Sequence, residues 1–82
     1  MDIDKAIFHL DDSIIALKLM QKTFLNIADV LSFSSLNLAI EHIHDLPDVS
    51  CFIIDLELVE GTGFDFVKIL RQMEKYKTTP IS

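Results

Sequence analysis

The sequence predicts an α/β fold with a doubly wound parallel sheet. Two observations carry this prediction: short apolar runs alternate with segments of helical spacing, and few residues break regular structure. The only prolines are Pro47 and Pro80, and the only glycines are Gly61 and Gly63. Strict alternation of strands and helices with short connections is typical of βαβ units, in which helices cover both faces of a parallel sheet.

Three apolar runs are the candidate strands. They cover residues 6–10, 28–33 and 51–54, and the third is the most hydrophobic. The first is nearly continuous, which is typical of a strand that is buried on both faces. Residues 78–82 resemble the start of a fourth strand. The predicted order is therefore strand, helix, strand, helix, strand, helix and the beginning of a strand.

The segments between these runs carry apolar residues three and four positions apart, the pattern of an amphipathic helix. The first predicted helix spans residues 13–25, the second runs from Leu36 to Pro47, and the third begins near Phe64. Serine and aspartate residues that can cap a helix stand before the first helix, and serines before the second. A loop that contains both glycines is expected between the third strand and the third helix.

The composition indicates a folded domain with an acidic surface. The chain has 82 residues, half of them apolar, and a mean hydropathy of +0.37, which excludes a disordered acidic tail. A net charge of −6 disfavours direct binding of nucleic acid or of anionic lipid. No apolar window suits a membrane span or a signal peptide, and the single cysteine cannot form an internal disulfide. We therefore expect a cytoplasmic protein.

Three carboxylates directly follow predicted strands. Asp11 and Asp12 end the first run, and Asp55 follows the third. If the strand order begins 2-1-3, these strand ends are neighbours at the edge where such sheets bind ligands. Mutual repulsion of the three carboxylates would be relieved by a divalent cation, and hard oxygen ligands suit Mg²⁺. Asp55 follows the most apolar strand and is the predicted nucleophile toward a phosphoryl group.

These residues resemble the receiver domain of two-component response regulators, the CheY-like family. Residues 7–13 resemble its apolar strand with an acidic pair, and residues 34–40 resemble the start of its second helix. In residues 52–64, Gly63 follows Asp55 by eight positions, as in the family's phosphorylation loop. The resemblance implies a flavodoxin-like sheet of order 2-1-3-4-5. Residues 1–82 are then expected to hold its first three βα units and the start of strand 4, as a receiver domain cut off before that strand ends.

The resemblance also implies a role in a bacterial phosphorelay. Asp55 would accept a phosphoryl group from a sensor histidine kinase or a phosphotransfer protein. Asp12 and Asp55 would bind Mg²⁺ directly, Asp11 would act through water, and Glu57 would contribute its backbone carbonyl. Any enzymatic activity would be limited to self-catalysed phosphotransfer and autodephosphorylation, and an output domain or a second copy are further possible partners.

The sequence departs from the family pattern in two ways. Leu58 and Val59 stand where members usually have Met-Pro, which makes the loop less rigid. The 82 residues also offer no candidate for the Thr or Ser that ends the family's fourth strand, or for the Lys that ends its fifth. These departures leave open an alternative: a pseudo-receiver that serves as an interaction or dimerisation module without phosphotransfer. A phosphatase of the haloacid dehalogenase type is disfavoured, because that family requires a D-x-D motif that Asp11-Asp12 does not provide.

Two residue groups also have simpler interpretations. Asp11 and Asp12 can be read as a strand stop followed by a helix cap, without any metal. His9, within the first strand, is interpreted as a semi-buried polar residue whose hydrogen bonds are satisfied.

Overall fold

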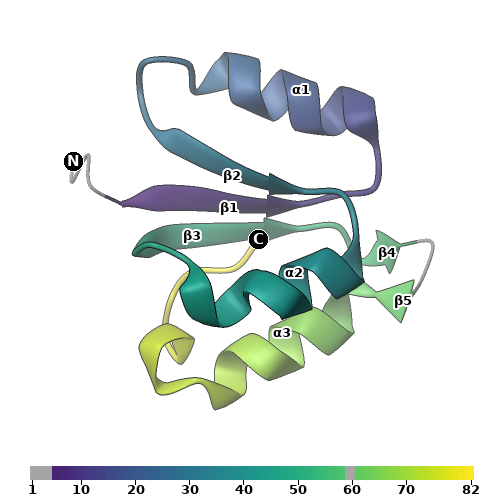
Figure 1. Cartoon of the computed structure of the whole chain (residues 1–82), viewed down its shortest axis with the longest axis vertical. Coiled ribbons are helices and arrows are strands. Elements are labelled where there is room, and N and C mark those ends of the chain that lie inside the picture. The colour runs from purple at the N-terminus through teal and green to yellow at the C-terminus, as the bar shows by residue number, and fades with distance from the viewer. Residues whose placement is uncertain (1–4, 59–60) are drawn as a thin grey trace.

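The computed structural model describes residues 5–58 and 61–82. The fold is built on a three-stranded parallel sheet of order β2-β1-β3. β1 (Ala6–Leu10) is the central strand, and β2 (Asp29–Phe33) and β3 (Val49–Ile54) pair with it on either side (Figure 1). The predicted fold class is therefore confirmed, and so is the expectation that the first and third strands are neighbours.

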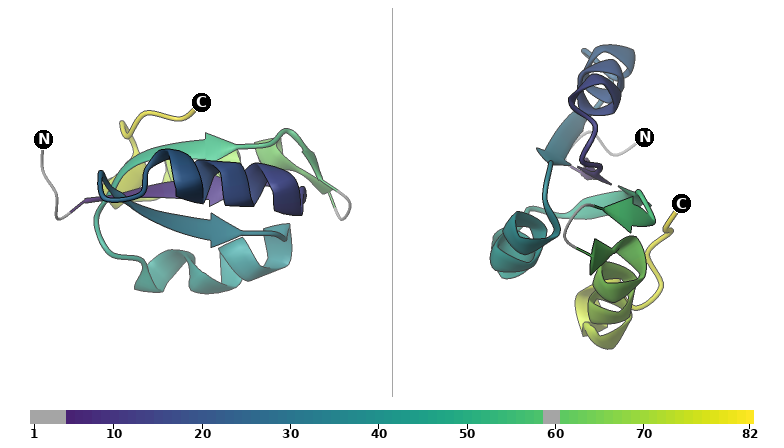
Figure 2. Two further views of the ribbon diagram at one scale, coloured as in Figure 1. Left: turned by 90° about the horizontal axis from the view of Figure 1, so that it is seen from above. Right: turned by 90° about the vertical axis from the view of Figure 1, so that its right-hand side faces the viewer.

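Helices cover both faces of this sheet. α1 (Ile14–Thr23) lies on one face, and α2 (Leu36–His42) and α3 (Gly63–Gln72) lie together on the other (Figure 2). A 3₁₀ turn continues α2 over Ile43–Asp45, and a second one follows α3 over Glu74–Tyr76. The doubly wound arrangement that the alternating pattern predicts is thus present.

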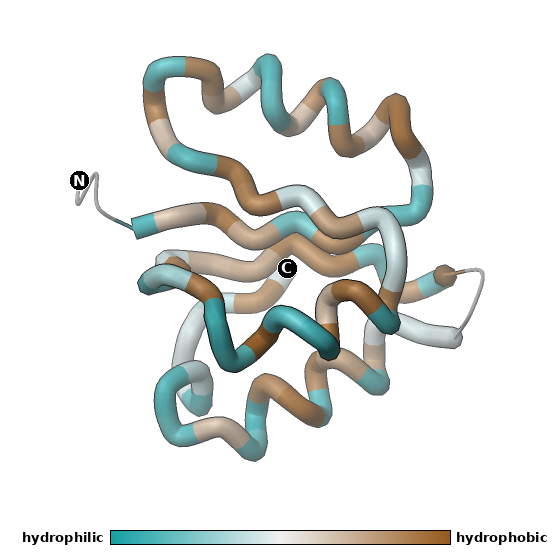
Figure 3. Tube along the Cα trace, viewed as in Figure 1, coloured by the Kyte–Doolittle hydropathy of each residue, from teal (hydrophilic) through white to brown (hydrophobic). Residues whose placement is uncertain are grey.

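The main hydrophobic core lies between the sheet and the α2–α3 layer. The ring of Phe8 is at its centre: it stacks on Phe33 and Phe66 at centroid distances of 4.9 and 5.2 Å, and lies 5.1 Å from Phe52. Stacked and tilted aromatic pairs of this kind add to the gain from burial alone. Figure 3 shows hydrophobic residues along the strands and alternating hydropathy along the helices. The buried members of this core are Phe8, Leu10, Leu36, Ala39, Ile43, Val49, Phe52, Ile54, Phe66, Leu70 and Tyr76.

The α1 face is covered more sparsely. Leu17 is the buried residue of α1, whereas Ile14, Ile15 and Leu19 are 56%, 73% and 60% exposed. Gln21 fastens the helix to the sheet edge, since its side-chain amide donates a 2.8 Å hydrogen bond to a β2 carbonyl. Within the part of the chain that the structure describes, no helix combines the length and apolar character that a membrane crossing needs.

The last residues run alongside β3. The backbone N–H of Phe52 donates to the carbonyl of Pro80 at 2.9 Å, and the N–H of Ser82 donates back to the carbonyl of Phe52 at 2.9 Å. Ile81 forms a parallel bridge with Phe52. The guanidinium of Arg71 donates to three carbonyl oxygens within residues 76–79, which holds the approach to this bridge. The predicted beginning of a fourth strand agrees with this pairing.

The connection between β3 and α3 is more regular than the sequence predicts. It contains two antiparallel two-residue strands, β4 (Glu57–Leu58) and β5 (Gly61–Thr62), where a loop was expected. Backbone pairing alone defines so short a ladder, because two residues are too few to show the apolar alternation that predicts a strand. Val59, which with Leu58 departs from the family's Met-Pro, lies outside the described residues.

Candidate functional site

The parallel register of the sheet brings the ends of β1 and β3 together. Leu10 and Ile54, the last residues of the two strands, are paired. The backbone N–H of Asp55 then donates a 2.8 Å hydrogen bond to the carbonyl of Leu10, and the N–H of Asp11 donates at 3.1 Å to the carbonyl of Phe33 in β2. These bonds fix the residues that follow β1 and β3 beside each other at the carboxyl edge of the sheet.

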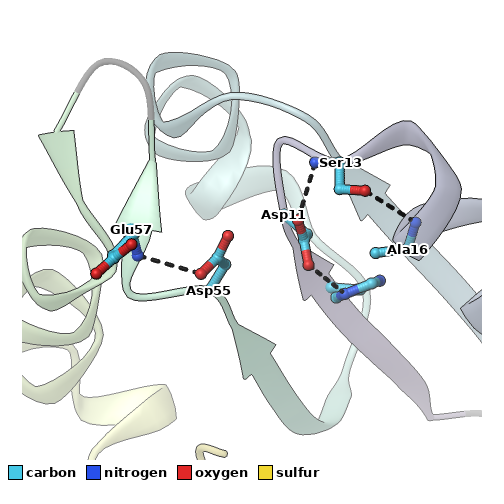
Figure 4. A network of polar contacts seen from close by, with 6 residues as sticks. Asp11, Ser13, Ala16, Asp55 and Glu57 are labelled. Atoms are coloured by element: carbon cyan, nitrogen blue, oxygen red, sulfur yellow. Dashed lines mark hydrogen bonds and ion pairs between the residues drawn. The ribbon is translucent and has the colours of Figure 1, made fainter.

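Three carboxylates converge at this edge. Asp11, Asp12 and Asp55 each offer an oxygen, and these three oxygens lie within 4.8 Å of one another. All three residues are partly buried. Figure 4 shows Asp11 and Asp55 at the ends of the two neighbouring strands. The juxtaposition expected from the sequence is therefore present, and three hard oxygen donors with solvent access form a ligand set that suits Mg²⁺.

The turn after β1 holds Asp11 and starts α1 at the same time. Asp11 Oδ1 accepts a 2.9 Å hydrogen bond from the backbone N–H of Ser13. The hydroxyl of Ser13 in turn accepts a 3.2 Å hydrogen bond from the N–H of Ala16, and so caps the helix (Figure 4). Ser13 is thus the N-cap residue. The simpler interpretation of Asp11 and Asp12 is therefore right about the strand stop, since β1 ends at Leu10, and wrong about the cap, which is Ser13. Asp11 and Asp12 both reach the acidic cluster.

The turn after β3 is held by a glycine that no other residue can replace without movement. The N–H of Gly63 donates a 3.1 Å hydrogen bond to the carbonyl of Leu56, which closes the loop beside Asp55. A Cβ on Gly63 would overlap the backbone carbonyl of Asp55 and would lie 2.7 Å from Cγ2 of Ile54. The absence of a side chain at position 63 therefore lets the start of α3 pack directly on Ile54 and Asp55 at the end of β3.

Glu57 lies next to the cluster through its backbone. Its N–H donates a 3.1 Å hydrogen bond to Asp55 Oδ1 (Figure 4). This bond occupies one oxygen of the Asp55 carboxylate and fixes its orientation, a contact that sequence spacing alone does not reveal. The use of the Glu57 carbonyl as a metal ligand stays a prediction.

His9 lies behind the cluster, and its environment differs from the one predicted. It is only 3% exposed, and its Nδ1 has no hydrogen-bond partner among the described residues. Its Nε2 is 3.8 Å from Asp11 Oδ2. Burial lowers the pKa of His9 below its ordinary value of 6.5, and the charges of Asp11 and Asp55 oppose that shift. The expectation of a semi-buried, satisfied histidine is therefore wrong. Residues two apart on a strand share a face, so the spacing of His9 and Asp11 could have indicated their contact.

Comparison with known proteins supplies structural relatives for this arrangement. No family model matches the chain, and no curated protein matches it. Two structures of the chemotaxis response regulator CheY4 of Vibrio cholerae are similar, with TM-scores of 0.84 and 0.85 at 27% sequence identity over 94% of this chain. This chain has the fold of a CheY-like receiver domain.

The match to CheY4 covers 64% of the CheY4 chain, so this chain spans less than two thirds of that protein's length. A response regulator receiver protein from Pseudomonas putida has a TM-score of 0.74 at 20% identity, over 99% of this chain and 67% of that one. At this identity, the likeness to the Pseudomonas putida protein shows the fold alone. The receiver fold and the strand order 2-1-3 that the sequence predicts are thereby confirmed.

Proposed function

We propose that this receiver domain acts in two-component signalling by accepting a phosphoryl group on Asp55 in a Mg²⁺-dependent reaction. The observation that carries the proposal is the convergence of Asp11, Asp12 and Asp55 within 4.8 Å at the carboxyl edge of the sheet. The likeness to CheY4 supports a signalling role of this kind. The donor would be a phosphohistidine on a sensor histidine kinase or a phosphotransfer protein, and residues 1–82 would belong to a cytoplasmic receiver domain.

The proposed nucleophile is one oxygen of Asp55. Oδ1 already accepts the N–H of Glu57, so the carboxylate is oriented and Oδ2 is the oxygen assigned to the attack. In the transfer, an O–P bond forms to Asp55 and the P–N bond of the donor breaks. The electron pair of that bond stays on the imidazole nitrogen, which takes up a proton from water. Hydrolysis of the resulting acyl phosphate would later restore the free carboxylate.

The metal would be held by Asp12 and Asp55 directly, by Asp11 through water, and by the backbone carbonyl of Glu57. When bound, Mg²⁺ supplies charge neutralisation at the phosphoryl oxygens. The protein's own part is to hold the carboxylates in place before the donor arrives. Asp11 is held by the Ser13 N–H and Asp55 by the Glu57 N–H, so little rearrangement is required at the moment of transfer.

Phosphorylation of the intact protein by a small phosphodonor such as acetyl phosphate tests this proposal. With Mg²⁺ present, mass spectrometry should detect the addition of one phosphoryl group, and chelation of the metal should suppress it. Asp55→Asn should abolish the addition. Asp48→Asn is the matched control, because Asp48 is a carboxylate whose side chain is 71% exposed and which pairs with Lys75 away from the cluster.

The same experiment separates the receiver from the pseudo-receiver alternative. A folded protein that gains no phosphoryl group and shows no change in thermal stability on addition of Mg²⁺ would fit the pseudo-receiver, which binds a partner without phosphotransfer. That result would contradict the proposal and leave the fold assignment intact.

A further inference from the structure

We propose that His9 is a positioning residue for the candidate metal site, with an Nε2–H group that faces Asp11 and holds its carboxylate in place. The inference rests on the proposed function, since it concerns how the metal-binding carboxylates are oriented. A buried imidazole at position 9 costs free energy, because its ring nitrogens lose their hydrogen bonds to water. β1 is buried along its whole length, and an apolar residue at position 9 would suit that environment without leaving any polar atom unpaired.

The imidazole is buried and aimed at one specific group. Its side chain is 4% exposed, and its Nε2 lies 3.8 Å from Asp11 Oδ2. This separation is longer than a hydrogen bond, yet it is close enough for a charge–dipole attraction in a site that is largely shielded from water. Asp11 itself is more accessible, with a side chain that is 20% exposed. The histidine therefore lies on the protein side of the carboxylate, away from the solvent from which a cation would enter.

The tautomer of the ring follows from the neighbours of its two nitrogens. An ionised carboxylate only accepts hydrogen bonds, so a lone pair on Nε2 would repel Asp11 Oδ2 whereas an N–H attracts it. Nδ1 is buried without a partner among the described residues, and placing the proton there would bury an unpaired N–H as well. Both considerations assign the proton to Nε2.

With this tautomer, both oxygens of Asp11 face a donor from the protein. Oδ1 accepts the N–H of Ser13 at 2.9 Å, and Oδ2 faces the N–H of His9. The carboxylate is thus held from two sides before any cation arrives. Groups that orient a metal-binding residue from behind commonly affect metal affinity about as strongly as some ligands do.

Ring-nitrogen NMR of the metal-free protein tests the contact directly. Proton–nitrogen correlations should place the His9 proton on Nε2, and Asp11→Ala should shift the His9 ring signals. A proton on Nδ1 would overturn the proposal. This measurement uses the native chain and requires neither metal binding nor phosphorylation.

Mg²⁺ titration of three variants tests the consequence for the metal site. His9→Met removes the donor while keeping a similar buried volume, and we expect the Mg²⁺ dissociation constant to rise by about 10-fold. His9→Gln retains an N–H donor near the position of Nε2, so its dissociation constant should stay close to the native one. His44→Gln, at an exposed histidine, is the control and should leave the dissociation constant unchanged.

The outcomes distinguish this inference from the proposed function. If the native protein binds Mg²⁺ and accepts a phosphoryl group, but His9→Met binds Mg²⁺ equally tightly, the positioning role is wrong and the proposed function stands. Equal weakening in His9→Gln and His9→Met would also overturn the role of the donor. If the native protein binds no Mg²⁺, the proposed metal dependence fails, and the positioning role fails with it.

Discussion

The two strand ends that build the acidic cluster hold their carboxylates by different means. At the end of β1, Asp11 is held by polar contacts: the N–H of Ser13 in the helix cap and the buried imidazole of His9. At the end of β3, Asp55 is held by close packing, since Gly63 lies against its backbone and the Gly63 N–H closes the loop. Polar contacts of the first kind can be weakened in steps, whereas close packing fails with the addition of one side chain.

Substitution of Gly63 should show the largest effect. Gly63→Val places a side chain where even a Cβ would overlap the backbone of Asp55, and we expect the free energy of unfolding to fall by about 2–3 kcal/mol. Thr62→Ala is the matched control, because Thr62 is exposed and its side chain does not cap α3; we expect a change within about 0.5 kcal/mol. Urea denaturation measures both. Equal stability of Gly63→Val and the native protein would show that the β3 end is not closely packed.

Mg²⁺ should stabilise the protein through the cluster that joins the two strand ends. Binding to the folded state alone raises the free energy of unfolding by about 1.4 kcal/mol when free Mg²⁺ is about ten times its dissociation constant. Thermal unfolding with and without a chelator should reveal this gain, and Asp55→Asn should lose it. A gain that persists in Asp55→Asn would place the stabilising cation elsewhere.

The cap at the β1 end should have a moderate effect. Ser13→Ala removes the acceptor for the Ala16 N–H, and we expect the free energy of unfolding to fall by about 1 kcal/mol. Ser35→Ala makes a matched comparison, because Ser35 caps α2 through the Leu38 N–H in the same way. Both variants should be destabilised to a similar extent. A much larger loss in Ser13→Ala would indicate that the β1 turn depends on the hydroxyl for more than the helix cap.

The smallest expected effect is a dependence of stability on pH from His9. Burial lowers its pKa in the folded protein below the ordinary value of 6.5, so the unfolded chain takes up a proton first as the pH falls. The free energy of unfolding should therefore decrease as the pH falls below about 6.5, and the contribution should level off once the folded protein is protonated as well. Denaturation of the native protein and of His9→Met between pH 7.5 and 5 isolates this contribution. The same slope in both proteins would contradict it.

Sequence patterns predicted the elements whose identity depends on local composition. β1 spans Ala6–Leu10 as expected, because an unbroken apolar run ends sharply at two acids. β3 begins at Val49, two residues before the predicted start, because the polar Ser50 separates Val49 from the apolar run although Val49 pairs with Ala6 of β1. α1 ends at Thr23, short of the predicted residue 25.

In the candidate site, too, some features could be predicted from the sequence and others depend on the folded structure. The convergence of Asp11, Asp12 and Asp55 could be predicted, since it follows from acids at the ends of adjacent parallel strands. The contact between the Glu57 N–H and Asp55 could not, because it depends on how the turn that leads into β4 folds. The proximity of His9 to Asp11 was open to prediction from their spacing of two residues, but the burial of His9 and its unpaired Nδ1 were not.

Mapping the phosphorylated residue tests the central claim most directly. Reduction of an acyl phosphate with borohydride converts the modified aspartate to homoserine, which peptide mass spectrometry can locate after treatment of the intact protein with acetyl phosphate and Mg²⁺. We predict homoserine at position 55 and unmodified aspartate at positions 11 and 12. Homoserine at any other position, or none in a folded protein that binds Mg²⁺, would contradict the assignment of Asp55 as the phosphoryl acceptor.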